Sequence, residues 1–439
     1  MTEGRIMPII LLFSIPLILG NLLQQMYNTA DSIIVGNYVG SSALAAVGAS
    51  TALINLLIAF SQGAAVGAGV VVSQFIGARD PNNTEKAVHT AICISLIIGV
   101  VLSIVGFCFS KNILIWMGTP ADILSGATLY LKIYASGLVF NVLYNMLTGI
   151  LNAAGNSKRP LYYLAAASIT NIFLDLLFIA IFHFGVEGAA IATVISQALS
   201  CILALRYLLT VDDSYRISIK KIKITKQLAK NIITIGLPAG IQNMVISFSN
   251  VLVQSAVNSF GSASVAGFAS YMKIDGFNIL PITSFSLAIT TFTGQNCGAG
   301  KIERVKRGTL ITLAMGVVYC AAIGIILLLF AYPLMRMFTS DEEVINVGIL
   351  AMKYFCPFYT LLAVLNIMAG TIRGAGKSLP PMIILLTAMC LFRIVWLHFF
   401  TPLFSDISGV FIIYPISWVL GVVMMLLYAW KGKWLPKSR

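Results

Sequence analysis

The sequence predicts an all-α integral membrane protein of twelve transmembrane helices, arranged as two parallel-repeat six-helix bundles around a central cleft. Of its 439 residues, 59% are hydrophobic and 10% are charged, whereas soluble domains carry about 25% charged residues. Apolar runs recur along the whole chain, each long enough to cross roughly 30 Å of hydrocarbon. The runs are continuous rather than alternating, so helices are the structure that satisfies the backbone in lipid.

Twelve spans follow from these runs, and several are long enough to require tilting or kinking. Pro16, Pro238, Pro281 and Pro357 lie inside spans and are candidate kinks. We expect Pro16 to act as a hinge in the first span. The predicted spans are residues 7–38, 44–75, 87–109, 123–151, 161–182, 187–209, 229–258, 263–293, 306–330, 344–371, 381–402 and 408–430.

The basic residues predict the orientation of the chain. Most of the 28 Lys and Arg residues fall in loops and tails on one side, and the opposite loops keep only Lys111 and Arg336. Under the positive-inside rule both termini are cytoplasmic, in a multi-pass protein of the plasma membrane. Because the net charge of +13 is dispersed among short loops, it does not indicate nucleic-acid binding.

The densest basic stretch predicts the division of the chain. The stretch "YRISIKKIKITKQLAK" separates the sixth and seventh spans. We therefore expect an N-terminal lobe at 1–210, a basic cytoplasmic linker at 211–228 and a C-terminal lobe at 229–439. A basic segment of this kind rests on anionic lipid headgroups, although its role in topology alone would explain its charge.

The two halves repeat each other. "GILNAAGNSKRP" after the fourth span matches "GTIRGAGKSLPP" after the tenth at a constant offset of 221 residues. "QFIGARD" after the second span matches "QNCGAGK" after the eighth at the same offset. Because each half has an even number of spans, the repeat is parallel, about an axis along the membrane normal. Two such bundles favour a secondary transporter that works by alternating access.

The acids of the first half are missing from the repeat. Asp31 corresponds to Val253 at an offset of 222, and Asp175 corresponds to Trp396 at an offset of 221. Asn171 likewise corresponds to a phenylalanine. A duplicated scaffold without duplicated polar residues indicates a function confined to the first half.

The polar residues of the first half share one depth. Asp31, Asp175 and Thr193 each lie six or seven residues from the outer end of their span, or roughly 10 Å at 1.5 Å per residue. Asn171 lies four residues before Asp175, on the same helix face. Such an oxygen-rich pocket can hold Na⁺ or share a proton. Intramembrane acids are costly and mark functional sites by default, although paired or locally satisfied acids remain an alternative.

The second half has its own charges inside spans. Lys273 and Asp275 fall in the eighth span and Arg393 in the eleventh. One interpretation is an ion pair between Asp275 and either base, which would be structural. The alternative is that Asp275 contacts a cationic substrate in the central cavity.

These features resemble the multidrug and toxic compound extrusion (MATE) family, over essentially the whole chain. The resemblance rests on two six-span lobes, on "P…QQMYN…D…VG" in the first span, and on "GQN.GAGK" and "G…NAAGNSKRP" in the loops. It implies efflux of cationic or amphipathic compounds in exchange for Na⁺ or H⁺. It also implies a cation site in the N-terminal lobe.

The resemblance also assigns residues. It places the cation site at Asp31, Asn171, Asp175 and Thr193, and a supporting polar network at Gln24, Tyr130 and Asn145. The glutamate that some members of the family carry in the seventh span has no counterpart in "AGIQNMVISFSNVLVQ". This absence favours the DinF-like branch, which relies on the first lobe.

The sequence is compatible with three functions. The first is a monomeric cation-coupled antiporter that exports drug-like organic cations without a cofactor, with H⁺ or Na⁺ as the coupling ion and no metal other than Na⁺. The second is a lipid-linked precursor flippase of the same superfamily. The third, a membrane-embedded enzyme, is disfavoured because the chain has no HExxH, GxSxG or Walker motif.

Overall fold

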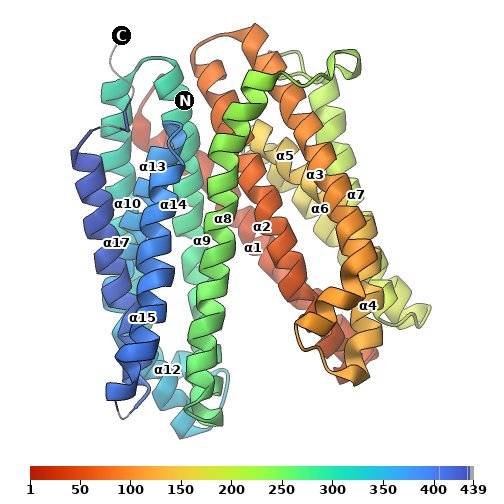
Figure 1. Cartoon of the computed structure of the whole chain (residues 1–439), viewed down its shortest axis with the longest axis vertical. Coiled ribbons are helices and arrows are strands. Elements are labelled where there is room, and N and C mark those ends of the chain that lie inside the picture. The colour runs from red at the N-terminus through yellow and green to blue at the C-terminus, as the bar shows by residue number, and fades with distance from the viewer. Residues whose placement is uncertain (405, 433, 436–439) are drawn as a thin grey trace. The chain divides into compact units, whose positions relative to one another are not determined.

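A computed structural model describes residues 1–404, 406–432 and 434–435 (Figure 1). The described residues form long helices and no strands. They divide into two compact units, which we call the N-lobe (Ile15–Gly240) and the C-lobe (Met1–Ser14 with Ile241–Arg439). The division therefore falls within the first helix and within the helix that follows the basic linker, and it places the linker in the N-lobe.

The N-lobe contains the first six spans. α1 begins in the C-lobe and passes into the N-lobe next to Pro16, through which the helix stays continuous. α2 packs against α5, α3 against α4 and α5, and α6 against α7. The helices are α1 (Ile6–Tyr38), α2 (Ser41–Gly77), α3 (Pro81–Trp116), α4 (Ala121–Ser136), α5 (Leu138–Ala153), α6 (Lys158–Asp175), the π-helical η1 (Leu176–Ile181) and α7 (Val186–Thr210).

The C-lobe contains the last five spans and the seventh span from Ile241 onward, and its core is aromatic. Phe355 contacts the rings of Phe268, Tyr271, Tyr414 and Trp418. The helices are α8 (Lys226–Asn258), α9 (Ser262–Gly298), α10 (Ile302–Leu329), α11 (Ala331–Arg336), α12 (Glu342–Phe355), η3 (Cys356–Phe358), α13 (Tyr359–Gly374), α14 (Leu379–Leu386), the π-helical η4 (Thr387–Leu391), α15 (Phe392–Phe399), η5 (Thr401–Leu403), α16 (Ser408–Phe411) and α17 (Ile413–Trp430).

Ten helices among the described residues are long and apolar enough to cross a membrane. An eleventh span is the pair of α4 and α5, which bends by 49° around Gly137. The twelfth predicted span is α9, which has 37 residues and is ample in length. Lys273 and Asp275 lie within it, and such charges lower the mean hydropathy of a helix. The structure thus agrees with about ten to twelve membrane helices in an all-α fold.

The backbone conformation of the loops repeats with the sequence. Gly40 and Gly261 have φ of 113° and 92°, and Gly155 and Gly376 have φ of 84° and 87°. These pairs are separated by the same 221 residues as the sequence motifs. Both turns require a left-handed residue, which glycine adopts without strain. The duplication therefore extends to the turns that join the spans.

Two pairs of glycines bring α2 and α8 into close contact within the N-lobe. Gly63 and Gly67 on α2 face Gly236 and Gly240 on α8. A Cβ atom added at Gly67 would lie 2.3 Å from the carbonyl oxygen of Ile232. Each pair has the small-xxx-small spacing that allows membrane helices to approach closely. The glycine-rich stretch "GAAVGAG" is therefore a packing feature.

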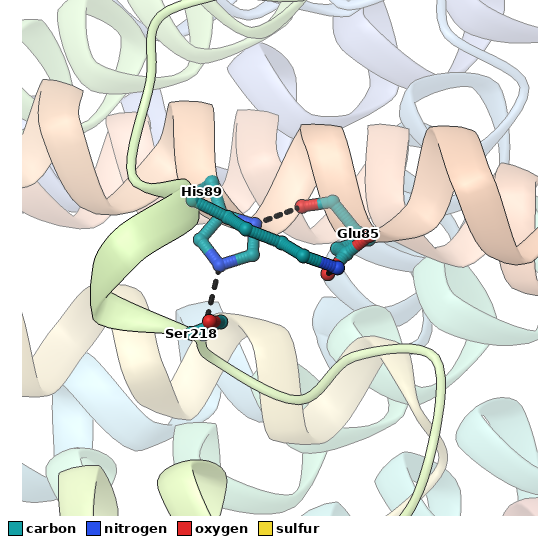
Figure 2. A network of polar contacts seen from close by, with 4 residues as sticks. Glu85, His89 and Ser218 are labelled. Atoms are coloured by element: carbon teal, nitrogen blue, oxygen red, sulfur yellow. Dashed lines mark hydrogen bonds and ion pairs between the residues drawn. The ribbon is translucent and has the colours of Figure 1, made fainter.

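The basic linker contacts the N-terminal part of α3 through side-chain hydrogen bonds and an ion pair (Figure 2). His89 Nε2 accepts a hydrogen bond of 2.9 Å from the Ser218 backbone N–H, and His89 Nδ1 lies 2.7 Å from the Glu85 carbonyl oxygen. Because the Ser218 N–H is only a donor, His89 is the neutral tautomer that carries its proton on Nδ1. Lys221 adds an ion pair to Glu85 at 2.7 Å. The linker also inserts Ile217 into the N-lobe core.

Replacement of His89 by leucine is expected to release this linker. The change leaves the Ser218 N–H without its partner, at a cost of about 1–2 kcal/mol. This cost corresponds to roughly a five- to thirtyfold rise in the open population of the linker. Tryptic cleavage at Arg216 and Lys223, followed by mass spectrometry, would measure it. His398→Leu, at an exposed histidine of α15, is the control. Equal cleavage rates in the two variants would contradict the prediction.

Candidate cation site

Asp31 lies in the C-terminal part of α1, seven residues before the helix ends at Tyr38. Its side chain is only 9% exposed. Within the described part of the chain, its Oδ1 atom is buried and accepts no hydrogen bond. A buried carboxylate oxygen without a donor is energetically costly. The site therefore favours a proton or a bound cation at this position.

Asn171 and Asp175 lie on the buried stripe of α6, together with Tyr163, Ala167 and Ser168. The spacing of these residues follows the helical period, which keeps them on one face. Both side-chain polar atoms of Asn171 and both carboxylate oxygens of Asp175 are buried and have no hydrogen-bond partner among the described residues. Four buried polar atoms without such a partner on one face make this stripe a candidate site for a cation.

A π-helical segment begins immediately after Asp175. The α-helical hydrogen bonding of α6 ends at Asp175, and η1 continues the span from Leu176 to Ile181. Single π-turns inside α-helices are frequent at functional sites because they redirect the side chains next to them. The structure thus places a local change of helix geometry at the more deeply buried of the two acids.

The two acids meet inside the N-lobe. The carboxyl groups of Asp31 and Asp175 lie close enough to interact with one another, and the hydroxyls of Tyr27 and Tyr130 lie within electrostatic range of both. Two negative charges in one buried site repel each other. A single proton or monovalent cation between them removes that repulsion. The arrangement is therefore suited to binding one positive charge reversibly.

The remaining predicted site residues differ in their placement. Thr193 is buried on α7, which packs against α6. Asn145 donates instead to Asn141 Oδ1 at 2.9 Å, within α5. Gln24 is exposed on α1 and contacts the Tyr27 hydroxyl. In the part of the chain that the structure describes, no printed hydrogen bond links Thr193 or Asn145 to the acids, so their roles as ligands stay predictions.

Tyr27 was not identified from the sequence. It lies four residues before Asp31 on α1, so the two side chains share a helix face. That spacing is the signal that could have identified it. Its hydroxyl interacts with the Gln24 side chain and lies within electrostatic range of both acids, so Gln24 lies at the edge of the predicted site.

The expected ion pair in the C-lobe is not formed. Asp275 accepts a hydrogen bond of 2.7 Å from the Tyr359 hydroxyl, which in turn lies 2.7 Å from the Tyr271 hydroxyl. Lys273 is exposed, and its ammonium group lies 5.9 Å from the centre of the Phe338 ring. The prediction that Asp275 pairs with Lys273 or Arg393 is therefore wrong among the described residues, because hydroxyl donors occupy the carboxylate instead.

Two duplicated six-helix lobes, with a buried acid pair in the first, form an architecture expected of a membrane transporter. The sequence profile of the MatE family matches residues 16–177 and 238–397. The probable multidrug resistance protein YpnP of Bacillus subtilis (strain 168) is 30% identical over 436 residues, which cover 99% of this chain and 97% of that protein. The chain belongs to the MATE family of multidrug efflux transporters.

Two further comparisons agree. The probable multidrug resistance protein YoeA of Bacillus subtilis (strain 168) is 28% identical, and the match covers 97% of this chain and 94% of that protein. A structure described as the outward-facing conformation of a multidrug resistance MATE family transporter has a TM-score of 0.92 and 26% identity, covering 99% of this chain and 98% of that one. Membership of the DinF-like branch stays a prediction, and the flippase alternative is not favoured.

Proposed function

We propose that this protein is an antiporter of the plasma membrane that exports organic cations and amphipathic drugs in exchange for H⁺ or Na⁺. The observation that carries the proposal is the unpartnered polar set of Asp31, Asn171 and Asp175. This set is absent from the duplicated half, so the scaffold does not require it. A site with two acids and no fixed base among the described residues is suited to exchanging one positive charge for another.

The exchange follows from the electrostatics of the pair. Without a bound cation, Asp31 and Asp175 repel each other and attract a cationic substrate. Entry of a proton or Na⁺ neutralises the pair and removes both effects, so the substrate is released. A ligand shifts a conformational equilibrium only by its differential affinity for the two states. The neutralised pair therefore stabilises the N-lobe conformation in which the two carboxyl groups are close together.

α1 is the element that would respond. It carries Asp31, passes from one lobe to the other next to Pro16, and lacks one backbone hydrogen bond because proline has no N–H. Bending at such a position costs less than bending elsewhere in a helix. We therefore assign Pro16 the role of hinge. The cytoplasmic placement of both termini and the monomeric state are parts of the same proposal.

The coupling ion can be determined in proteoliposomes. Rhodamine 123, a fluorescent amphipathic cation, is loaded, and a Na⁺ gradient or a pH gradient is imposed separately. Transport is expected to follow one of these gradients and to stop when the ionophore for that ion dissipates it. Membrane potential is clamped with K⁺ and valinomycin in all arms. A transport rate that depends on neither the Na⁺ gradient nor the pH gradient would contradict the proposal.

A further inference from the structure

The C-lobe contains a buried arginine without an acidic partner. Arg393 on α15 is 3% exposed. Its Nε and Nη1 atoms donate hydrogen bonds of 3.3 Å to Ser417 Oγ and Asn250 Oδ1, and its guanidinium lies 4.3 Å from the centre of the Tyr414 ring. All three contacts are neutral, and both hydrogen bonds are long for charge-assisted ones.

No carboxylate compensates this charge directly. Among the described residues, the ion pairs within 4.0 Å do not include Arg393. Asp275, which interacts electrostatically with the same Tyr414 side chain, accepts a hydrogen bond from the Tyr359 hydroxyl. An unpaired charge inside a membrane protein is costly to bury. Structural arginines in such positions are normally paired, so the absence of an acid here requires another explanation.

The position of Arg393 mirrors that of the acid pair. Arg393 lies six residues before the outer end of its span at Phe399, and Asp175 lies six residues before the end of η1 at Ile181. At 1.5 Å per residue, each lies about 9 Å inside the end of its span. This depth is below the level of lipid headgroups. The two groups of opposite charge therefore lie at the same distance from the ends of their spans, three residues apart in the repeat alignment, because Asp175 itself aligns with Trp396.

The partners of Arg393 also occupy corresponding spans. Asn250 aligns with Asn28 of the first span at an offset of 222, and Tyr414 aligns with Thr193 of the sixth at an offset of 221. The predicted cation site of the N-lobe draws on the first, fifth and sixth spans. The C-lobe builds the Arg393 cluster from the seventh, eleventh and twelfth, which are their repeats. The cluster is thus the positional counterpart of the cation site, with its sign reversed.

We propose that Arg393 is an anion-binding site for the carboxylate of a substrate. A planar guanidinium binds a carboxylate through two parallel hydrogen bonds, and Arg393 keeps N–H groups beyond the two that Ser417 and Asn250 occupy. Asn250 is exposed on α8, so a ligand that reaches it also reaches the guanidinium. This inference rests on the proposed export function and specifies its substrates: amphipathic molecules that combine a cationic group with a carboxylate.

A matched pair of dyes tests the inference. Rhodamine 110 has a free carboxylate, and rhodamine 123 is its methyl ester, so the two differ only in the group that Arg393 would bind. Affinity is measured by fluorescence anisotropy on purified full-length protein. Arg393→Gln is expected to weaken rhodamine 110 binding by about 10- to 100-fold, the range for a charge-assisted hydrogen bond, and to leave rhodamine 123 unchanged.

Two further variants separate recognition from structure. Arg393→Lys keeps the charge and removes the planar fork, so it is expected to give an intermediate loss for rhodamine 110 alone. Arg373→Gln removes another partly buried arginine of the C-lobe, one that donates to Gln242 at 3.2 Å, and is expected to affect both dyes equally or neither. An equal loss of both dyes in Arg393→Gln would show a structural arginine and overturn the inference.

Displacement of the two dyes by benzoate tests the inference on the original protein, so the test does not depend on the folding of the variants. Benzoate, which has a carboxylate and no cationic group, is expected to displace rhodamine 110 and not rhodamine 123. Failure of benzoate to displace rhodamine 110 would overturn the inference. Rhodamine 123 export reports on the proposed function independently, because the ester cannot use Arg393. Normal ester export with no carboxylate effect would therefore reject only the anion site.

Discussion

Replacement of Asp31 by asparagine is expected to reduce ion-coupled drug efflux to the level of empty liposomes. Asparagine has nearly the same shape, so it keeps the packing of α1 and removes only the exchangeable charge. The remaining acid, Asp175, can then no longer share a cation with a second carboxylate. The measurement is rhodamine 123 transport under the driving gradient, at protein amounts matched by gel filtration.

The same variant is expected to be as thermally stable as the original chain, or more stable. Asp31 Oδ1 is buried and unpartnered among the described residues, so the carboxylate contributes a desolvation cost without a compensating hydrogen bond. Loss of transport with undiminished stability separates a functional acid from a structural one. Asp122→Asn, at an exposed acid in the first turn of α4, is the control and should transport normally. Normal efflux by the Asp31 variant would contradict the mechanism.

The pair should behave as one unit. If Asp31 and Asp175 share a single cation, the variant that carries both asparagines is expected to be no worse than either single variant, because residues that act together are not additive. A residual activity in one single variant that disappears in the double variant would instead indicate two independent sites. Comparison of the double variant with the single variants therefore tests whether the two acids share one cation, and not only whether each acid is needed.

The two acids could be predicted from the sequence because the evidence for them depends only on positions along the chain. The repeat offset shows that Asp31 and Asp175 lack counterparts, and counting residues from span ends shows that they share one depth. Both arguments use distance along the chain. The structure agrees on the second point, since Asp31 and Asp175 lie seven and six residues from the ends of their spans.

The contacts of the second lobe could not be predicted in the same way. Lys273, Asp275 and Arg393 are all charged and lie in two spans, and the sequence does not specify how each helix is rotated about its axis. The rotation of α9 directs Asp275 toward Tyr359, and that of α15 directs Arg393 toward Asn250 and Ser417. An ion pair inferred from composition alone therefore failed, and the unpaired arginine emerged only from the structure.

Replacement of Gly67 by alanine is expected to destabilise the N-lobe strongly. The new Cβ would lie 2.3 Å from the Ile232 carbonyl oxygen and 2.7 Å from the Gly236 backbone nitrogen. Both contacts are with backbone, which cannot rotate away as a side chain can. Helices α2 and α8 must then separate and lose contacts along their whole crossing, at a cost of about 3 kcal/mol or more, the upper end for overpacking.

Gly48→Ala on the same helix isolates the cause. A Cβ at Gly48 would meet nothing within 4 Å, so this variant gains the helix propensity of alanine, about 1 kcal/mol, and meets no clash. The two variants have identical composition and both add one methyl group to α2. Thermal unfolding followed by gel filtration in detergent should rank Gly48→Ala at or above the original chain and Gly67→Ala well below it.

The comparison also bears on transport, because α8 continues beyond Gly240 into the C-lobe. The glycine crossing fixes the first half of α8 to α2, while the second half carries Asn250, the partner of Arg393. A substitution that separates α2 from the first half of α8 weakens this contact and leaves the acid pair and Arg393 unchanged. Variants at Gly63 that still fold, with lowered thermal stability, are therefore expected to lose transport. A normal transport rate in such a variant would show that the contact between α2 and α8 has no mechanical role in transport.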